Sequence, residues 1–170
     1  MIVKFKKYNE SAKVPHKAHK DDFCYDVYAV SEKEIAPNVW EYGLGFALQM
    51  ERDYEIVETG VYDYDCCACE ADKVIDFQHS PLNLSIDIRP RSSVWKTGMV
   101  LSNCVGTGDE GYRGEYKAVF FHVMPDMPRY KVGDKILQIK LGMAFPMKIV
   151  ETEELNQTER GEGGFGSTGK

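Results

Sequence analysis

The sequence predicts a single domain of the all-β class. Short apolar runs recur along the 170 residues and are separated by turns rich in Gly, Pro, Asn and Asp, while helical periodicity is almost absent. A hydrophobic content of 43% and a charged content of 28% are typical of a globular protein, and a chain of this length can bury a core without disulfides. Together these observations favour a β-barrel or β-sandwich.

The expected strands follow one another along the whole chain. They cover residues 1–7, 23–30, 40–50, 84–88, 99–101, 116–123, 136–141 and 144–150, with residues 40–50 interrupted by Gly43 and Gly45. Strict alternation in residues 136–141 places Gln138 on the same face as Ile136 and Lys140. The run 23–30 contains one carboxylate, Asp26, which either faces water at a strand edge or meets cations and hydrogen-bond donors.

Charge and cysteine usage limit the classes of partner. A net charge of −6 argues against a general nucleic-acid or anionic-membrane surface, although it permits a small cationic pocket. No apolar segment is long enough to span a bilayer and the N-terminus lacks an apolar signal core, so we expect a cytoplasmic protein. The five cysteines fit reduced thiols better than a disulfide framework. Cys66, Cys67 and Cys69 have a tighter spacing than most zinc sites, so partly buried thiols are favoured over a structural metal.

Two glycine-rich regions carry groups suited to phosphate. In residues 90–115, Arg91-Ser92-Ser93 supplies a cation and two hydroxyl donors, and the turn 106–114 holds Asp109 and Tyr112 three residues apart. In residues 158–170, successive glycines allow backbone N–H groups to converge on an anion. Each region has an ordinary alternative, a surface hairpin for the first and a disordered tail for the second.

Read in order, five segments resemble the motifs of the trimeric dUTPase family. They are residues 24–28 (CYDVY), 90–93 (PRSS), 106–114 (GTGDEGYRG), 133–138 (GDKILQ) and 160–169 (RGEGGFGSTG). The resemblance implies a distorted jelly-roll barrel (β-clip) that assembles as a homotrimer with active sites shared between subunits. The barrel domain would cover residues 1–157, with an insertion at 51–82, and residues 158–170 would form a flexible lid that closes over the nucleotide.

The resemblance also implies the reaction, which is hydrolysis of dUTP to dUMP and pyrophosphate with Mg²⁺. This activity keeps uracil out of DNA and supplies dUMP for thymidylate synthesis. Asp109 matches the catalytic base, and Asp26 matches the aspartate that holds Mg²⁺ through water. The residues assigned to the nucleotide are Arg91, Ser92, Ser93, Asn103, Gly108, Tyr112, Gln138, Arg160, Phe165, Gly166, Ser167 and Thr168. Tyr112 would pack on the deoxyribose and exclude a 2′-hydroxyl, and Phe165 would cover the uracil.

Three departures distinguish this chain from the family pattern. Gly108 stands where Ile or Leu is usual, which predicts a looser turn before Asp109. Trp95 occupies a position that is usually small, so the local packing must differ. Residues 51–82 replace a short hairpin, which suggests a phage-like branch and offers a site for a protein partner.

Two alternative functions remain at this stage. A dUTP-responsive regulatory protein would use residues 51–82 to hold its partner, but the intact Asp109 and complete lid motif favour catalysis. A dCTP deaminase shares the Arg-Ser-Ser element, but it needs a Thr-Leu-Glu run where this chain has residues 115–120 (EYKAVF).

Overall fold

The computed structural model describes residues 1–51 and 82–163, and the all-β prediction is confirmed. The first sheet pairs β1 (Ile2–Lys7) with β5 (Phe46–Glu51). The second has the order β2 (Tyr25–Tyr28), β10 (Lys135–Ala144), β6 (Asn83–Pro90) and β8 (Gly106–Asp109). The third has the order β3 (Ser31–Ala36), β4 (Val39–Gly43), β9 (Lys117–His122) and β7 (Met99–Leu101).

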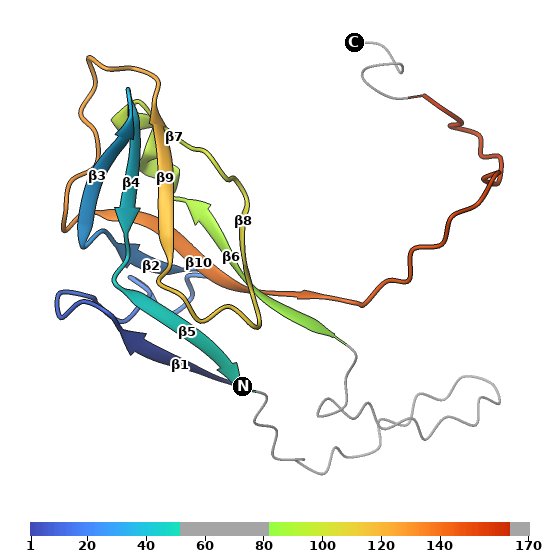
Figure 1. Ribbon diagram of the computed structural model, residues 1–170, viewed down its shortest axis with the longest axis horizontal. Helices are drawn as coiled ribbons and strands as arrows, with labels where there is room; N and C mark the ends of the chain where they lie inside the picture. The colour runs from blue at the N-terminus through green and yellow to red at the C-terminus, as the bar shows by residue number, and fades with distance from the viewer. Residues whose placement is uncertain (52–81, 164–170) are drawn as a thin grey trace.

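The core lies between the two four-stranded sheets. Figure 1 shows β3, β4, β9 and β7 standing side by side across strands β2, β10 and β6, with β1 and β5 below them. The largest fully buried side chains come from both sheets, from β5 and from the segment between β4 and β5, and they are Tyr42, Phe46, Phe120, Leu44, Ile136, Leu137 and Val27. Burial of each large apolar side chain contributes on the order of 2 kcal/mol, so the core accounts for the pairing of the sheets.

One face of the second sheet is polar because its strands alternate. Asp26 on β2 lies opposite Gln138 on β10, which lies opposite Arg89 on β6. One step along the same face, Lys140 lies opposite Asp87. The intervening apolar residues point into the core, so the sheet presents a charged outer surface over an apolar inner one.

The expectation that Gln138 shares its face with Ile136 is wrong. The register between β2 and β10 shifts between Lys135 and Leu137, which is a β-bulge at Ile136. Ile136 and Leu137 are adjacent in the sequence, yet both are 0% exposed. The bulge therefore resets the alternation, so that Lys140 shares the face of Gln138 as expected and Ile136 does not.

The structure also changes the expected element boundaries. Residues 106–109 form strand β8 against β6 rather than part of a turn, and β3 and the short 3-10 helix η2 (Ser92–Thr97) were not expected. The strand expected at residues 144–150 is wrong, because β10 ends at Ala144 and residues 145–150 have no regular structure. The side chains of residues 145–150 are exposed within the described chain. Residues 145–163 lead away from the body (Figure 1).

Several expectations fall on residues outside the described ranges. They concern most of the insertion at 51–82, including Cys66, Cys67 and Cys69, and the lid residues Phe165, Gly166, Ser167 and Thr168. Within the described ranges, no helix has the length and apolar character needed to cross a membrane.

Candidate active site

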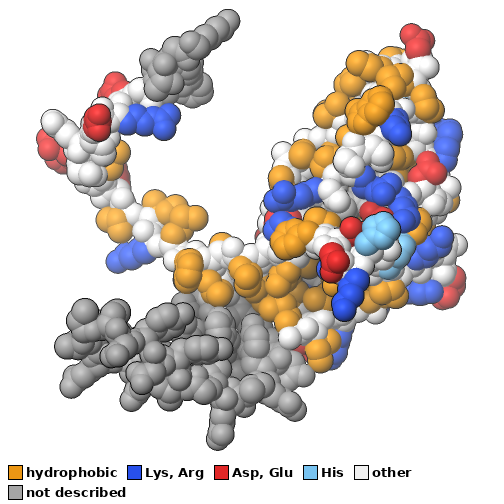
Figure 2. Space-filling model, turned by 180° about the vertical axis from the view of Figure 1, so that it is seen from behind, with side chains coloured by type: hydrophobic (Ala, Val, Ile, Leu, Met, Phe, Trp, Pro, Cys, Tyr) orange, Lys and Arg blue, Asp and Glu red, His pale blue; other side chains and the backbone are white. Residues whose placement is uncertain are grey.

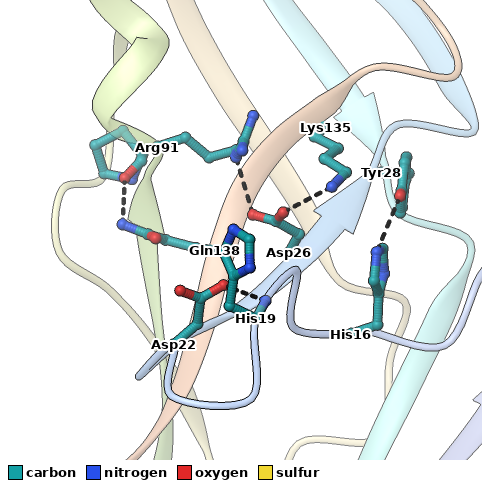
Figure 3. A network of polar contacts seen from close by, with 9 residues as sticks. His16, His19, Asp22, Asp26, Tyr28, Arg91, Lys135 and Gln138 are labelled. Atoms are coloured by element: carbon teal, nitrogen blue, oxygen red, sulfur yellow. Dashed lines mark hydrogen bonds and ion pairs between the residues drawn. The ribbon is translucent and has the colours of Figure 1, made fainter.

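Asp26 forms the centre of a cluster of cationic and polar side chains on the polar face of the second sheet, here named the Asp26 pocket. The residue is only 9% exposed, and both carboxylate oxygens are paired (Figure 3). Arg91 Nε donates to Oδ1 at 2.9 Å, and Lys135 Nζ donates to Oδ2 at 3.0 Å. Of the two environments open from the sequence, the structure selects the ion-paired one, which offsets the cost of removing a carboxylate from water.

Three elements bring the surrounding groups to Asp26. Arg91 directly follows β6 and caps η2 in an extended conformation, so its guanidinium returns over the sheet. Gln138 lies opposite Asp26 on the neighbouring strand, and its amide donates to the Pro90 carbonyl at 3.1 Å. The expected residues Asp26, Arg91 and Gln138, which come from three separate sequence segments, therefore lie together (Figure 3).

Lys135 is a pocket residue that the sequence analysis missed. Strict alternation puts residue 135 on the face opposite Gln138, and only the bulge at Ile136 turns the Lys135 side chain towards Asp26. The hydrogen bond to Asp26 raises the pKa of the Lys135 ammonium, so this group stays charged. The only signal in the sequence was the adjacent apolar pair Ile136-Leu137, which departs from the alternation of the rest of the strand.

A second ion-pair cluster extends the pocket along the same face. Lys140 Nζ lies 2.8 Å from Asp87 Oδ2, and Arg89 lies 3.4 Å from the same oxygen. The hydrogen bond from Lys140 holds the pKa of Asp87 below its usual value. With Arg91 and Lys135, these residues place four cations against the carboxylates of Asp26 and Asp87. Asp22 on the neighbouring loop adds a third carboxylate, which leaves an excess of one positive charge that suits an anionic ligand.

The loop before Asp26 lies against the pocket. Backbone hydrogen bonds join His16 and Asp26 in both directions, and the His16 ring stacks on Tyr28 with centroids 5.6 Å apart. Within the loop, the His19 N–H donates to Asp22 Oδ2 at 2.8 Å. Figure 3 shows the side chains of His19 and Asp22 on the side of the loop that faces Gln138 and Asp26. Figure 2, a view from behind, shows His side chains among Lys, Arg and acidic side chains on one face of the body.

The two hydroxyls of the expected phosphate clamp lie beside Arg91. Ser92 and Ser93 open η2, whose first backbone hydrogen bond runs from Val94 N to Arg91 O at 3.0 Å. The Trp95 side chain is 70% exposed, so the large residue at this position projects outward and leaves the core packing unchanged.

Asp109 lies far from Asp26 within the chain. Asp109 ends β8 opposite Ser85, whereas the Asp26–Gln138 row meets β6 at Arg89. Asp26 and Asp109 are therefore offset by four residues along the strands and by three strand spacings across the sheet. This offset places them on the order of 20 Å apart. Asp109 is exposed, and so is Asn103 in the segment before β8. One chain therefore does not unite the expected base with the expected phosphate and metal residues.

The turn after Asp109 is held by its own hydrogen bonds. Tyr112 N donates to Asp109 O at 3.0 Å, and the Tyr112 hydroxyl donates to Glu115 O at 2.9 Å. The Glu115 carboxylate accepts from Gly45 N at 2.9 Å, which anchors the turn to the segment between β4 and β5. Tyr112 remains 44% exposed, so part of its ring is available to a ligand.

Gly108 makes room for an aromatic ring. A Cβ at this position would lie 2.5 Å from the ring of Tyr116, which is buried and packs edge-on against Tyr112 at 5.3 Å. Burial also raises the pKa of the Tyr116 hydroxyl. The predicted loosening of the turn is therefore not observed, because Tyr116 fills the space that a side chain at residue 108 would need.

Of the expected lid residues, the structure describes Arg160. It is exposed, and its Nε donates to Gly163 O at 2.8 Å in a turn where Gly161 has a φ of 51°. No contact joins this described part of the lid to the Asp26 pocket.

A divalent metal has one suitable protein ligand in the pocket. The described residues contain no group of three or more His, Cys, Asp or Glu side chains that could hold a metal alone. A carboxylate has about four lone-pair sites, and the two ion pairs of Asp26 leave room for hydrogen bonds from metal-bound water. This donor set fits Mg²⁺, which keeps several waters and takes other oxygens from phosphates.

Comparisons with known proteins agree on one family. The family model described as dUTPase matches residues 44–169. The deoxyuridine 5′-triphosphate nucleotidohydrolase of Clostridium kluyveri is 35% identical over 170 residues, with 99% of each chain covered. The protein of the same name from Clostridium novyi is 33% identical over 170 residues, again with 99% of each chain covered.

Solved structures share the fold at lower identity. The dUTPase of Staphylococcus bacteriophage 80alpha with dUPNHPP has a TM-score of 0.72 and 18% identity, with 99% of each chain covered. The dUTPase from phage phi11 of S. aureus has a TM-score of 0.62 and 15% identity, with 93% of this chain and 100% of that chain covered.

The packing of Gly108 leads to a stability prediction. Gly108→Ala is expected to lower the free energy of unfolding by about 1–3 kcal/mol, because the added Cβ overlaps the buried Tyr116 ring. Urea denaturation followed by fluorescence measures the change. The matched control is Gly111→Ala in the same turn, where a Cβ meets nothing within 4 Å. Equal stabilities for the two variants would show that Tyr116 does not need the glycine.

Proposed function

Because the chain belongs to the dUTPase family, we propose that the Asp26 pocket of one copy and the Asp109–Tyr112 turn of another form one active site. Membership makes the protein a dUTP diphosphatase, which hydrolyses dUTP to dUMP and pyrophosphate and uses Mg²⁺. The observation that carries the proposal is the separation within one chain between Asp109 and the Asp26–Gln138 row.

The phosphate chain of dUTP binds in the cationic pocket. Arg91 uses Nε to hold Asp26, which leaves its two terminal nitrogens free to donate to phosphate oxygens. Ser92 and Ser93 add hydroxyl donors beside it, and Gln138 adds its side-chain amide. The excess of positive charge over these strands offsets part of the charge of the triphosphate.

Asp26 holds Mg²⁺ through water while Arg91 keeps the carboxylate in position. The ion supplies charge neutralisation to the phosphate oxygens when it is bound. The protein's own contribution is the buried, oriented carboxylate, whose place on β2 is set by pairing with β10 and by the loop at His16.

Asp109 serves as the general base. Its exposed carboxylate accepts a proton from a water molecule as the water oxygen bonds to phosphorus. The oxygen that bridges the α- and β-phosphates then separates from the phosphorus that the water attacked, and it leaves with the electron pair of the broken bond. The products are dUMP and pyrophosphate. Positioned general bases contribute about 10²–10⁴-fold in rate.

The Asp109–Tyr112 turn also selects the nucleoside. The Tyr112 side chain is held by the hydrogen bond of its hydroxyl to Glu115 O and by edge-on packing against Tyr116. Its exposed ring therefore forms a rigid surface for the deoxyribose. A rigid surface rejects a 2′-hydroxyl because it cannot move aside. Backbone groups of the hairpin that contains Asn103 and Gly108 recognise the uracil edge.

A homotrimer supplies the second copy. The dissociated chain exposes Phe145, Met147 and Ile149 on a segment that leaves the body, and such a segment needs another surface to cover it. Residues 158–170 then act as a lid, in which Arg160 and the hydroxyls of Ser167 and Thr168 hold the terminal phosphate while Phe165 and Gly166 lie over the uracil. Closure of such a lid excludes water from the bound nucleotide.

The role of Asp109 predicts a loss of turnover without a loss of binding. Asp109→Asn is expected to lower kcat by about 10²–10⁴-fold, because the amide cannot accept the proton. Pyrophosphate release measures kcat, and calorimetry measures the affinity for a non-hydrolysable imido analogue of dUTP. Asp126→Asn, which changes an exposed aspartate in another turn, is the control. A fully active Asp109→Asn enzyme would remove Asp109 from the reaction.

The shared site predicts complementation between two inactive variants. Asp109→Asn chains keep an intact pocket, and Arg91→Met chains keep an intact base. If the two are unfolded and refolded together, about a quarter of the sites in random trimers combine both intact residues. Activity should therefore reappear in the mixture, measured against each variant refolded alone. No recovery in trimers shown to be mixed would contradict a site built from two copies.

The lid predicts a separable effect of truncation. A chain that ends before Arg160 is expected to lose at least about 10²-fold in kcat/KM, because the open site no longer completes the phosphate contacts. Circular dichroism should show an unchanged β fold, since the last strand of the described residues ends at Ala144. Near-normal turnover by the truncated chain would exclude a catalytic lid.

A further inference from the structure

Lys135 has the position of a substrate-binding residue, although neither the motif assignments nor the reaction described above gives it a role. Its ammonium lies 3.0 Å from Asp26 Oδ2, on the opposite side of the carboxylate from Arg91 (Figure 3). The side chain starts at the first residue of β10, three positions before Gln138. It is therefore part of the same pocket and reaches it from the beginning of the inner strand β10.

A local distortion of the strand turns Lys135 to this side. Without the bulge at Ile136, alternation would place residue 135 on the face opposite Gln138. With the bulge, Ile136 and Leu137 both enter the core and Lys135 meets Asp26. The turn before the strand is held by Lys131 N donating to Asp134 Oδ2 at 2.7 Å and by Ala29 N donating to Asp134 O at 3.0 Å. Bulges that re-aim one side chain are common beside active sites.

The charges at Asp26 do not balance in the nucleotide-free chain. One carboxylate faces two cations, and the proposed function requires a third cation, Mg²⁺, to approach the same group. A triphosphate brings several negative charges to the pocket at that moment. We propose that Lys135 is a phosphate-binding residue, whose ammonium moves from Asp26 Oδ2 to a phosphate oxygen when the nucleotide binds.

The exchange is physically feasible for these two residues. Lys135 carries its charge on a flexible four-carbon stem, and its side chain is 30% exposed, so the ammonium can move by rotation alone. Asp26 keeps its pairing with Arg91 Nε throughout, so no buried carboxylate is left without a cation. The vacated Oδ2 would then be available to hold Mg²⁺ through its water shell. Lys135 thus links phosphate binding to the release of Asp26 for the metal.

The test compares ligands that differ in phosphate number. Lys135→Met is expected to weaken binding of the imido analogue of dUTP about tenfold, with and without Mg²⁺, because one charge-assisted hydrogen bond is lost. Binding of dUMP should change by less than about twofold, since a monophosphate makes fewer such bonds. Lys135→Arg should restore most of the triphosphate affinity. Calorimetry measures the affinity of each variant for each ligand. Thermal unfolding temperatures equal to that of the unchanged protein show that the variants keep the fold.

The matched control is Lys131→Met. Lys131 is an exposed lysine in the turn that precedes the same strand, so its removal changes the net charge equally without touching Asp26. We expect less than about a twofold change for either ligand, because exposed charges are screened. An equal loss of affinity for the two lysine variants would attribute the effect to net charge and would overturn the proposal.

A double-mutant cycle separates direct contact from an effect through Asp26. In an Asp26→Asn background, Lys135→Met should still weaken analogue binding about tenfold if the ammonium contacts phosphate. If Lys135 only orders Asp26, the second substitution will have no further effect, and the proposal is wrong. An equal loss for dUMP and for the triphosphate would overturn it as well.

This inference rests on the proposed phosphate pocket, and one further variant separates the two. Arg91→Met should abolish analogue binding if the pocket is correctly assigned. Loss of binding in Arg91→Met together with normal binding in Lys135→Met would overturn only the role of Lys135. Normal binding in both variants would overturn the pocket and, with it, the inference.

Discussion

The buried ion pair between Asp26 and Arg91 is the interaction on which the candidate site depends. A carboxylate on an otherwise apolar strand is costly to bury, and the two cations that offset this cost arrive from β6 and β10. Pairing of β2 with β10 and of β10 with β6 is therefore required both for the fold and for the pocket. A change that weakened this sheet would separate the three groups before it unfolded the rest of the chain.

The pocket and the Asp109–Tyr112 turn are organised by different means. The pocket is ionic and lies on the edge strand β2 and its neighbours β10 and β6, where the register determines which side chains meet. The turn relies on Tyr112, Tyr116 and Glu115, which hold it by aromatic packing and by hydrogen bonds with the backbone instead of ion pairs. Each part is rigid without the other, which is what two separate surfaces need if they are to meet across an interface.

Much of this arrangement was predictable from the sequence. The all-β class followed from strand-length apolar runs, and the family followed from five motifs in order. The position of Asp26 among cations was one of two open possibilities, because burial of a carboxylate does not reveal its partners. Lys135 was missed because a bulge reverses the alternation from which faces are inferred. The strand expected at residues 144–150 was wrong because composition shows that a segment is apolar, but not whether a partner strand exists in the same chain.

The distance between Asp109 and Asp26 has a kinetic consequence for newly synthesised protein. Under the proposed shared site, a single chain holds the residues assigned to phosphate, while its own Asp109 lies too far from Asp26 to act as their base. Before it assembles, such a chain would sequester nucleotide without consuming it, and hydrolysis would begin only when chains meet. At low expression the rate of hydrolysis would then rise more steeply than in proportion to the amount of protein. Hydrolysis would thus have a threshold in enzyme concentration, set by the distance between the two parts of the site and without a separate regulator.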